Sequence, residues 1–182
     1  MKLMPTPEKK APCITLIGMP GAGKSTIGTL LAQKTDNAFI DTDHLIEATY
    51  GLPLQAITDA FGKEKFLDVE AEVVASLRAC RAVIATGGSV VYREKAMRRL
   101  QELGTIVYIR LPFEEIERRV ARNPQRGIAM GPNQTLLDIF NERAELYERY
   151  ADLSIDMTDL SPGESAEAVF EAVKNSGFFG EE

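Results

Sequence analysis

The sequence has few of the residues that mark several protein classes. It contains two cysteines and one histidine among 182 residues. Two cysteines cannot build a disulfide scaffold, and free thiols suit a reducing compartment, so we expect a cytoplasmic protein with Cys13 and Cys80 as small core residues. His44 has no cysteine or carboxylate cluster of metal-ligand spacing beside it, which argues against a zinc site. No apolar run approaches the roughly 18 residues of a membrane span, and residues 1–11 lack the apolar core of a secretory signal.

Basic residues are also in the minority. The 21 lysines and arginines are outnumbered by 27 acidic residues, which gives a formal net charge of −6. Nucleic-acid binding favours a basic field and stacked aromatic side chains, and the sequence has neither, so no nucleic-acid partner is expected. The charge is uneven, however, because nine basic residues against five glutamates lie between Arg93 and Arg126. A local anion site is therefore compatible with an acidic chain.

Short apolar runs alternate with helical patterns along the chain. Hydrophobic residues make up 45% of it, which is enough for the core of one domain at residues 12–176, between a flexible leader at 1–11 and a flexible tail at 177–182. The alternation predicts an α/β fold with a mostly parallel sheet, whose ligands bind at the carboxyl ends of the strands. The predicted strands are residues 13–17, 38–40, 82–85, 105–109 and 153–155. The predicted helices are residues 25–34, 43–50, 62–79, 93–103, a segment after Pro112, 135–150 and 162–174.

The strongest motif follows the first predicted strand. Residues 18–25 are Gly-Met-Pro-Gly-Ala-Gly-Lys-Ser, which matches the phosphate-binding pattern G-x-x-x-x-G-K-[ST] without a mismatch. Glycines let backbone amides turn toward phosphate oxygens, and the N-terminus of the next helix favours an anion. We expect the lysine to reach the β- and γ-phosphates of ATP and the serine hydroxyl to bind Mg²⁺. The predicted nucleotide-binding residues here are Gly18, Gly21, Ala22, Gly23, Lys24, Ser25 and Thr26.

Two aspartates follow the second predicted strand. Asp41 and Asp43 are two residues apart, so in an extended segment both carboxylates face the same side. Phosphoryl transfer needs one carboxylate near the metal and one near the attacking hydroxyl, which suggests these roles for the pair. The structural alternative is that Asp43 caps a helix starting at His44. The nearby phosphate-binding loop favours the catalytic interpretation.

A glycine turn and several arginines complete the pattern. Gly87-Gly88-Ser89 follows the strand at 82–85, where a substrate could lie against backbone amides, although a plain turn has the same composition. Arginine can clamp a transferring phosphoryl group or hold a carboxylate. A solvated helix face is the preferred interpretation for Arg118 and Arg122. The remaining candidates of this kind are Arg119, Arg126 and Arg143.

These elements occur in an order that resembles the shikimate kinase family. The resemblance covers residues 14–174 and includes the segments Phe39-Ile-Asp-Thr-Asp43 and Arg143-Ala-Glu-Leu-Tyr147, which are more diagnostic than the phosphate-binding loop. It implies a P-loop kinase three-layer sandwich, with a five-stranded parallel sheet flanked by helices and a mobile lid at about residues 122–133. It also implies a phosphotransferase of amino-acid biosynthesis that phosphorylates a hydroxyl of a small carboxylate-bearing metabolite with ATP. Shikimate, giving shikimate 3-phosphate, is the first candidate, and a monomer is expected.

The resemblance also implies roles for the individual residues. Asp41 would assist Mg²⁺ beside Ser25, and Asp43 would hold and deprotonate the acceptor hydroxyl. Arg119 would pack on the adenine, and Arg126 would fold from the lid onto the phosphates as a catalytic residue together with Lys24. The implied acceptor-binding residues are Asp43, Gly87, Gly88, Ser89 and Arg143.

The sequence departs from the family pattern in the acceptor pocket. Leu67 stands where the family has an arginine that shares the acceptor carboxylate, and Ser89 replaces the third glycine of the turn. Losing one partner of a buried carboxylate–arginine contact typically costs about 2–5 kcal/mol. Either another cation, Arg78 or Arg93, replaces the arginine, or the acceptor is a different hydroxy acid such as homoserine. A catalytically idle nucleotide-binding module that regulates a partner is an alternative of another class.

Overall fold

The computed structural model describes residues 12–122, 128–131 and 133–177. Five strands form one sheet in the order β2-β3-β1-β4-β5, and all four neighbouring pairs are parallel. The predicted α/β class and five-stranded parallel sheet are confirmed. Half of the predicted lid, including Arg126, lies outside the described residues. The strands are β1 (Cys13–Ile17), β2 (Ala38–Asp41), β3 (Ala82–Ala85), β4 (Gly104–Arg110) and β5 (Leu153–Asp156).

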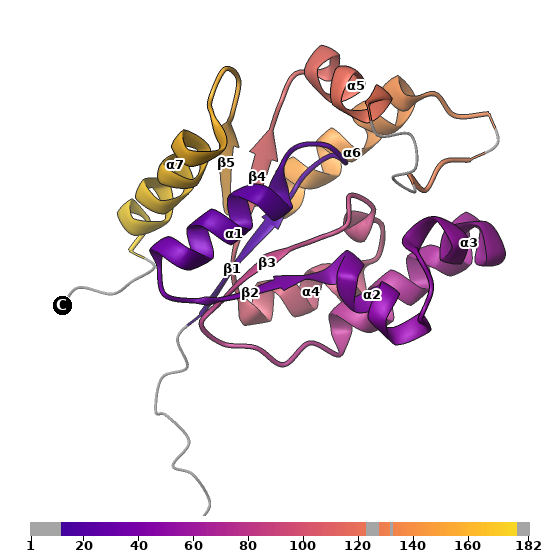
Figure 1. Ribbon diagram of the computed structural model, residues 1–182, viewed down its shortest axis with the longest axis horizontal. Helices are drawn as coiled ribbons and strands as arrows, with labels where there is room; N and C mark the ends of the chain where they lie inside the picture. Colours follow the sequence, from indigo (N-terminus) through magenta and orange to yellow (C-terminus); the bar gives the residue numbers. More distant parts are fainter. Residues whose placement is uncertain (1–11, 123–127, 132, 178–182) are drawn as a thin grey trace, which may run out of the picture.

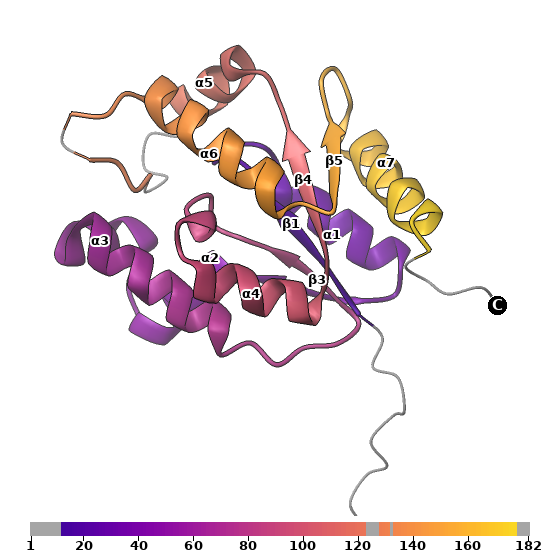
Figure 2. The ribbon, with the colours of Figure 1, turned by 180° about the vertical axis from the view of Figure 1, so that it is seen from behind.

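Helices cover both faces of the sheet (Figures 1 and 2). One face carries α1 and α7, which pack on each other, and the other carries α4 and α6. The helices α2 and α3 pack together beyond the carboxyl end of β2 (Figure 1). The helices are α1 (Lys24–Lys34), α2 (Thr42–Tyr50), α3 (Leu54–Ala75), the 3₁₀ turn η1 (Val90–Tyr92), α4 (Glu94–Leu103), α5 (Phe113–Ala121), α6 (Leu136–Tyr150) and α7 (Pro162–Asn175).

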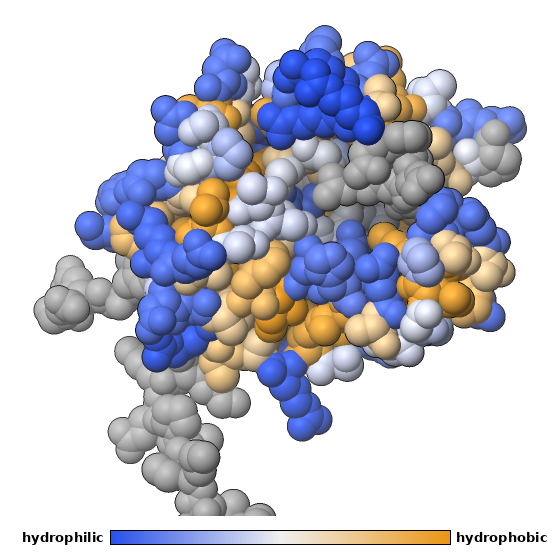
Figure 3. All heavy atoms as spheres, in the orientation of Figure 1, coloured by the Kyte–Doolittle hydropathy of each residue, from blue (hydrophilic) through white to orange (hydrophobic). Residues whose placement is uncertain are grey.

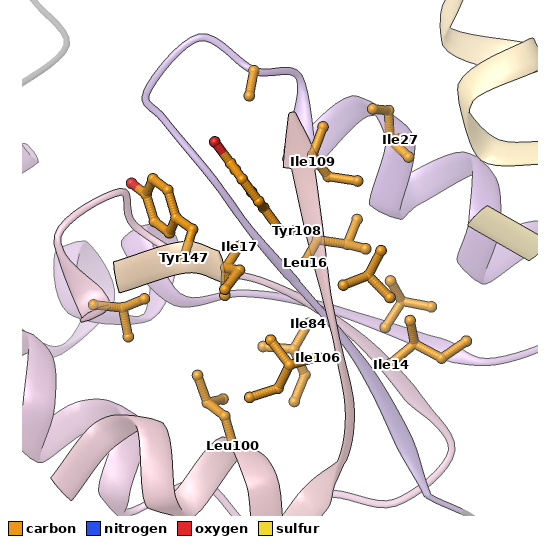
Figure 4. Packing of buried hydrophobic residues seen from close by; sticks show 14 of the residues in the cluster. Ile14, Leu16, Ile17, Ile27, Ile84, Leu100, Ile106, Tyr108, Ile109 and Tyr147 are labelled. Atoms are coloured by element: carbon orange, nitrogen blue, oxygen red, sulfur yellow. The ribbon is translucent and has the colours of Figure 1, made fainter. Parts of the chain in front are cut away.

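The central strand β1 is buried along its whole length, which explains its uninterrupted apolar sequence. Its side chains alternate between the two faces of the sheet: Ile14 and Leu16 point toward Ile27 of α1, whereas Ile17 points toward Tyr147 of α6 (Figure 4). Tyr147 stacks on Tyr108 of β4, with ring centroids 5.0 Å apart. The apolar core therefore lies on both faces of β1 and leaves the carboxyl ends of the strands for other contacts.

The longest helix differs from the prediction at both ends. It begins at Leu54 instead of residue 62 and ends at Ala75 instead of residue 79. Gly62 is the only residue inside it with non-helical backbone angles, φ 73° and ψ 169°, so two helical segments meet there at a kink. The first segment forms because Ile57 is buried in a small apolar cluster with Phe66. Gly62 and the nearby Pro53 are typical of breaks between helices, so the sequence predicted a helix starting at residue 62 and could not reveal this packing.

The two cysteines also differ from each other. Cys13 is fully buried, and burial raises the pKa of its thiol. Cys80 is exposed, so its predicted place in the core was wrong. It lies just after α3, where that helix has ended and the chain turns toward β3. Cys80 was predicted to be a core residue because cysteine is a small apolar residue, but the turn before β3 directs its side chain outward.

The surface is uneven in character. Hydrophilic side chains gather over α5, whereas apolar ones gather around β2 and α2 (Figure 3). None of the helices within the described ranges combines the length and the apolar character that a membrane crossing requires.

Candidate active site

The phosphate-binding loop joins β1 to α1 at the carboxyl edge of the sheet. Gly23 is the N-cap of α1 with φ 94°, a conformation that favours glycine, and no side chain caps the helix. The first amides of α1 are therefore left without a side-chain acceptor at the positive end of the helix. This combination suits a bound phosphate group.

The side chains of Lys24 and Ser25 have different hydrogen-bond partners. The Lys24 ammonium group donates to the carbonyl oxygens of Gly18 at 2.7 Å and Met19 at 2.9 Å, so it lies across its own loop. The Ser25 hydroxyl donates to Oδ2 of Asp41 at 2.7 Å. Of the other predicted loop residues, Ala22 is buried and Thr26 is exposed.

Asp41, and not Asp43, caps α2. Its Oδ1 accepts hydrogen bonds from the backbone amides of Asp43 at 3.0 Å and His44 at 3.4 Å. The suggested capping role of Asp43 was therefore wrong, because β2 extends to Asp41 and the helix begins at Thr42, two residues before His44. Asp43 lies in the first turn of α2 and lines a pocket beside the phosphate-binding loop.

That pocket brings together parts of the chain that are far apart in sequence. Gly21, Gly23, Lys24 and Ser25 line one side of it. Other walls come from Asp43, from Phe66 and Glu70 of α3, and from residues 86–89 after β3. The predicted nucleotide loop, second aspartate and glycine turn thus share one pocket.

Glu70 is a residue of this pocket that the sequence analysis did not select. Its side chain is 1% exposed, and its Oε2 accepts a hydrogen bond from the Ser89 hydroxyl at 2.7 Å. Burial, and then the charge of Asp43, raise the pKa of Glu70 to about 7. The available signal was its place four residues after Phe66 and directly after Val69, which puts an acid beside the apolar face of the predicted helix at 62–79.

The glycine turn is shaped by what surrounds it. A Cβ on Gly87 would overlap Oε1 of Glu70 and lie 2.7 Å from Oδ1 of Asp43, so any larger residue would displace the two acids. A Cβ on Gly88 would lie 2.6 Å from Cδ of Pro20 and 3.1 Å from Nη1 of Arg143. The turn therefore packs between the phosphate-binding loop, the two carboxylates and α6.

Arg143 and Tyr147 of α6 are both buried beside this turn. Arg143, 1% exposed, donates to the carbonyl of Ala129 at 2.9 Å and to the Tyr92 hydroxyl at 3.3 Å. Tyr147 donates to the carbonyl of Gly88 at 2.5 Å, and its hydroxyl lies 3.9 Å from the sulfur of Met19. Arg143 and Tyr147 thus hold the glycine turn from behind, since Gly88, which lines the pocket, lies close to both of them.

Arg119 and Arg118 of α5 occupy different surroundings. Arg119 donates to the carbonyl of Gly21 at 3.3 Å and so lies against the phosphate-binding loop. Arg118 pairs with Glu115 at an exposed position, as expected for a solvated helix face. Arg126 lies outside the described residues.

Neither suggested replacement for the missing arginine lies at the pocket. Arg93 is paired with Glu64 at 2.9 Å and with Asp68 at 2.7 Å at the surface. Arg78 borders a separate groove with Cys80, next to the start of β4. Leu67 itself is buried in the small apolar cluster with Ile57 and Phe66.

Comparison with known proteins decides the family. A family model described as shikimate kinase matches residues 20–174. The chain belongs to the shikimate kinase family. A shikimate kinase of Chromohalobacter salexigens is 42% identical over 147 residues, covering 79% of this chain and 82% of the relative. A shikimate kinase of Chromobacterium violaceum is 37% identical over 158 residues, covering 85% and 86%.

A solved structure agrees with these relatives. The shikimate kinase from Acinetobacter baumannii, in complex with shikimate, superposes with a TM-score of 0.83 at 29% identity, covering 91% of this chain and 94% of that one. Members of the shikimate kinase family are ATP-dependent phosphotransferases that act on a hydroxyl group. The predicted family and the predicted kinase activity on a small carboxylate-bearing metabolite are confirmed. The comparisons give no support to the idle-module alternative, and the monomeric state stays a prediction.

Proposed function

We propose that this protein transfers the γ-phosphoryl group of ATP to the 3-hydroxyl of shikimate. The observation that carries the proposal is the pocket where the phosphate-binding loop meets Asp43 and the turn against which Arg143 packs. A nucleotide phosphate, a hydroxyl and a carboxylate would each meet a suitable group there. The match to the Acinetobacter baumannii structure with shikimate supports this acceptor.

The nucleotide half of the pocket fits ATP with Mg²⁺. The uncapped amides after Gly23 suit phosphate oxygens, and Ser25 and Asp41 offer two adjacent oxygen ligands. Mg²⁺ is usually held by one or two protein oxygens together with substrate phosphates and waters, which agrees with the lack of any cluster of three His, Cys, Asp or Glu in the described residues. When bound, the ion would neutralise part of the charge on the phosphates. Arg119 would pack on the adenine and Arg126 would approach the phosphates.

The residues of this chain would then act mainly by positioning and charge. Arg143 would hold the acceptor carboxylate, and Asp43 would accept a hydrogen bond and then the proton from the attacking hydroxyl. A bond forms between that hydroxyl oxygen and the γ-phosphorus while the bond to the β,γ-bridging oxygen breaks, so ADP leaves. Lys24 would move from its loop carbonyls to the phosphates and offset the negative charge there.

Shikimate is favoured over homoserine by the residues that surround the acceptor. The pocket wall formed by Phe66 and Leu54 is apolar and suits a carbocyclic ring. The same pocket has two acids, Asp43 and Glu70, which suits an acceptor with several hydroxyl groups. Homoserine has one hydroxyl and no ring, so it would leave part of this surface without a partner.

An ADP-release assay over shikimate, homoserine and gluconate tests the proposal. We expect kcat/KM for shikimate to exceed that for the other two by about a hundredfold or more, because buried polar groups reject acceptors that leave them unpaired. Mass spectrometry should identify one added phosphoryl group on shikimate. A higher kcat/KM for homoserine or gluconate would overturn the choice of acceptor.

A further inference from the structure

The ring of Tyr92 is bordered by two positive charges, one of which has no role in the transfer steps above. The guanidinium carbon of Arg143 lies 5.2 Å from the ring centroid, and the ammonium nitrogen of Lys63 lies 5.5 Å from it. Both distances are within the range of cation–π attraction. Lys63 belongs to α3 and Arg143 to α6, so two distant segments of the chain place their charges beside one phenol.

Neither cation forms an ion pair with a carboxylate within the part of the chain that the structure describes. Arg143 is 1% exposed, and its hydrogen bonds go to two neutral acceptors, the carbonyl oxygen of Ala129 and the Tyr92 hydroxyl. Glu70 interacts with Arg143 electrostatically, but at longer range than an ion pair. A deeply buried charge is costly without a counter-ion, so an anion brought by a ligand would be stabilised here.

One nitrogen of Arg143 is available for such an anion. The hydrogen bonds that this side chain makes with described residues use Nε and Nη2 and leave Nη1 without an acceptor. Nη1 lies 3.1 Å from the position that a Cβ on Gly88 would occupy, and Gly88 lines the pocket. The unused donor therefore lies next to the turn that borders the acceptor.

The half-buried Lys63 ammonium group also has donors to spare. It donates to Oε1 of Gln134 at 2.8 Å, and that neutral oxygen also accepts from the backbone amide of Gly131. An ammonium group has three donors, so two remain for a ligand. Leu67 follows four residues later on the same helix face, but it is buried in the small apolar cluster and offers no charge. The charge on this part of α3 beside Tyr92 is therefore that of Lys63.

We propose that Lys63 is a specificity-determining residue whose ammonium group, together with Nη1 of Arg143, binds the carboxylate of the acceptor beside Tyr92. The proposal rests on the proposed function insofar as the acceptor carries a carboxylate. That group would extend past Gly88 toward Tyr92, beyond the residues that line the pocket. Gln134 holds Lys63 in place without cancelling its charge. An acceptor without the anion would leave both cations unpaired and would be rejected for that reason.

Lys65 provides a matched control on the same helix. Its ammonium nitrogen lies 4.7 Å from the ring centroid of Phe61, so it makes the same kind of contact as Lys63. Lys65 is exposed, however, and its aromatic partner packs on Tyr50 instead of on a buried arginine. Substituting either lysine by methionine removes the charge and keeps much of the apolar stem. Lys65→Met should therefore leave KM for the acceptor unchanged.

Steady-state kinetics of Lys63→Met, Lys63→Arg and Lys65→Met test the proposal, with shikimate and methyl shikimate as acceptors. We expect Lys63→Met to raise KM for shikimate about tenfold, the usual size for a lost hydrogen bond to a charged group, and to change KM for ATP less than about twofold. Lys63→Arg should recover most of the lost affinity. Methyl shikimate has no anion, so its KM should agree within about twofold between wild type and all three variants.

Gln134→Leu tests the structural alternative, in which Lys63 acts only by holding Gln134 and the chain around it. The diagnostic quantity is the ratio of kcat/KM for shikimate to kcat/KM for methyl shikimate. Lys63→Met should lower this ratio about tenfold, whereas Gln134→Leu should leave it unchanged. A ratio that stays at the wild-type value in Lys63→Met, or that falls equally in Gln134→Leu, would overturn the proposal.

Failure of the proposed function would give a different result. If wild type prefers another hydroxy acid, shikimate is the wrong acceptor, and the same ratio for that acid and its methyl ester decides the role of Lys63. A preference for an acceptor without a carboxylate would overturn both proposals. If Lys63→Met does not fold, Lys63→Gln, which keeps a polar end group but no charge, supplies the same comparison.

Discussion

The Ser25 hydroxyl donates to Oδ2 of Asp41 at 2.7 Å, while Oδ1 of the same carboxylate caps α2. One side chain therefore joins the first turn of α1 to the end of β2 and the start of the next helix. Oδ1 of Asp41 therefore stabilises the start of α2, whereas Oδ2 lies at the proposed metal site beside Ser25. Substitutions can separate these two contributions.

Asp41→Asn should keep the cap and lose the charge, because asparagine is as good an N-cap residue as aspartate. We expect its melting temperature to stay close to that of wild type, while the Mg²⁺ concentration that gives half-maximal activity rises several-fold. Asp41→Ala should lose both functions, with a stability loss of about 1 kcal/mol. Thermal unfolding and Mg²⁺ titrations measure the two effects. Thr135→Ala, which removes the capping box of α6, should cost similar stability without changing the Mg²⁺ requirement.

Lys24→Ala should nearly abolish phosphoryl transfer while the fold persists. The ammonium group donates to carbonyl oxygens of its own loop, at the edge of the sheet and away from the apolar core around β1, so its loss should not open that core. We expect kcat to fall by at least about a hundredfold, since charge stabilisation of the phosphates is lost. Circular dichroism gives the fold and ADP release gives kcat. Lys65→Ala, at an exposed position of α3, is the matched control, and wild-type turnover by Lys24→Ala would rule out the assigned role.

Asp43→Asn tests the assigned proton acceptor. Asparagine keeps the size of the side chain but cannot take the proton, so kcat should fall by about a hundredfold. The Michaelis constant for ATP should change little, because Asp43 faces the acceptor side of the pocket. Single-turnover measurements report the chemical step directly. An unchanged rate of that step would remove Asp43 from the mechanism.

Arg143→Lys tests carboxylate recognition. Lysine keeps the charge but loses the forked donors that reach Ala129 and Tyr92, so the side chain is less firmly held. We expect KM for the acceptor to rise at least about tenfold, in line with the loss of part of a buried charge contact. Methyl shikimate lacks the carboxylate charge, so its KM should be similar for wild type and for Arg143→Lys. Arg118→Lys, at an exposed position, should behave as wild type.

The raised pKa of Glu70 should appear in stability measurements. Its value of about 7 in the folded protein exceeds the ordinary value of 4.5, so the folded state binds this proton more tightly than the unfolded state. Folding is therefore penalised as pH rises from about 4.5 to about 7. Glu70→Gln should gain stability relative to wild type across this interval, by up to about 3 kcal/mol at the standard conversion. Urea unfolding of both proteins at pH 5 and pH 8 measures the difference.

The sequence predicted most of what is local and little of what depends on packing. The loop at Gly18–Ser25 and the two acids at and just beyond the end of β2 follow apolar runs directly, so strand ends and motif spacing sufficed to place them. The strand bounds differ from prediction by at most one residue at either end. Parallel sheets favour such success because their strands are continuous apolar runs.

Strand ends and motif spacing could not predict the role of Glu70 or the first helical segment of α3. Glu70 acquires its environment from Ser89 and Asp43, which belong to other elements, so its spacing from Phe66 placed it near the apolar face of its helix but could not predict these partners. The helical segment before Gly62 is stabilised by the burial of Ile57, which the neighbouring proline and glycine concealed. Contacts between distant segments determine both features.

Tyr147 has a consequence for how the two substrates influence each other. Its hydroxyl bonds the carbonyl of Gly88, in the turn beside the acceptor, and lies near Met19, in the loop that faces the nucleotide. The Tyr147 ring packs against the ring of Tyr108 on β4, which restricts the movement of the Tyr147 hydroxyl. One phenol thus contacts both the nucleotide loop and the acceptor turn, so we expect a nucleotide that repositions Met19 to alter the hydrogen bond that holds Gly88.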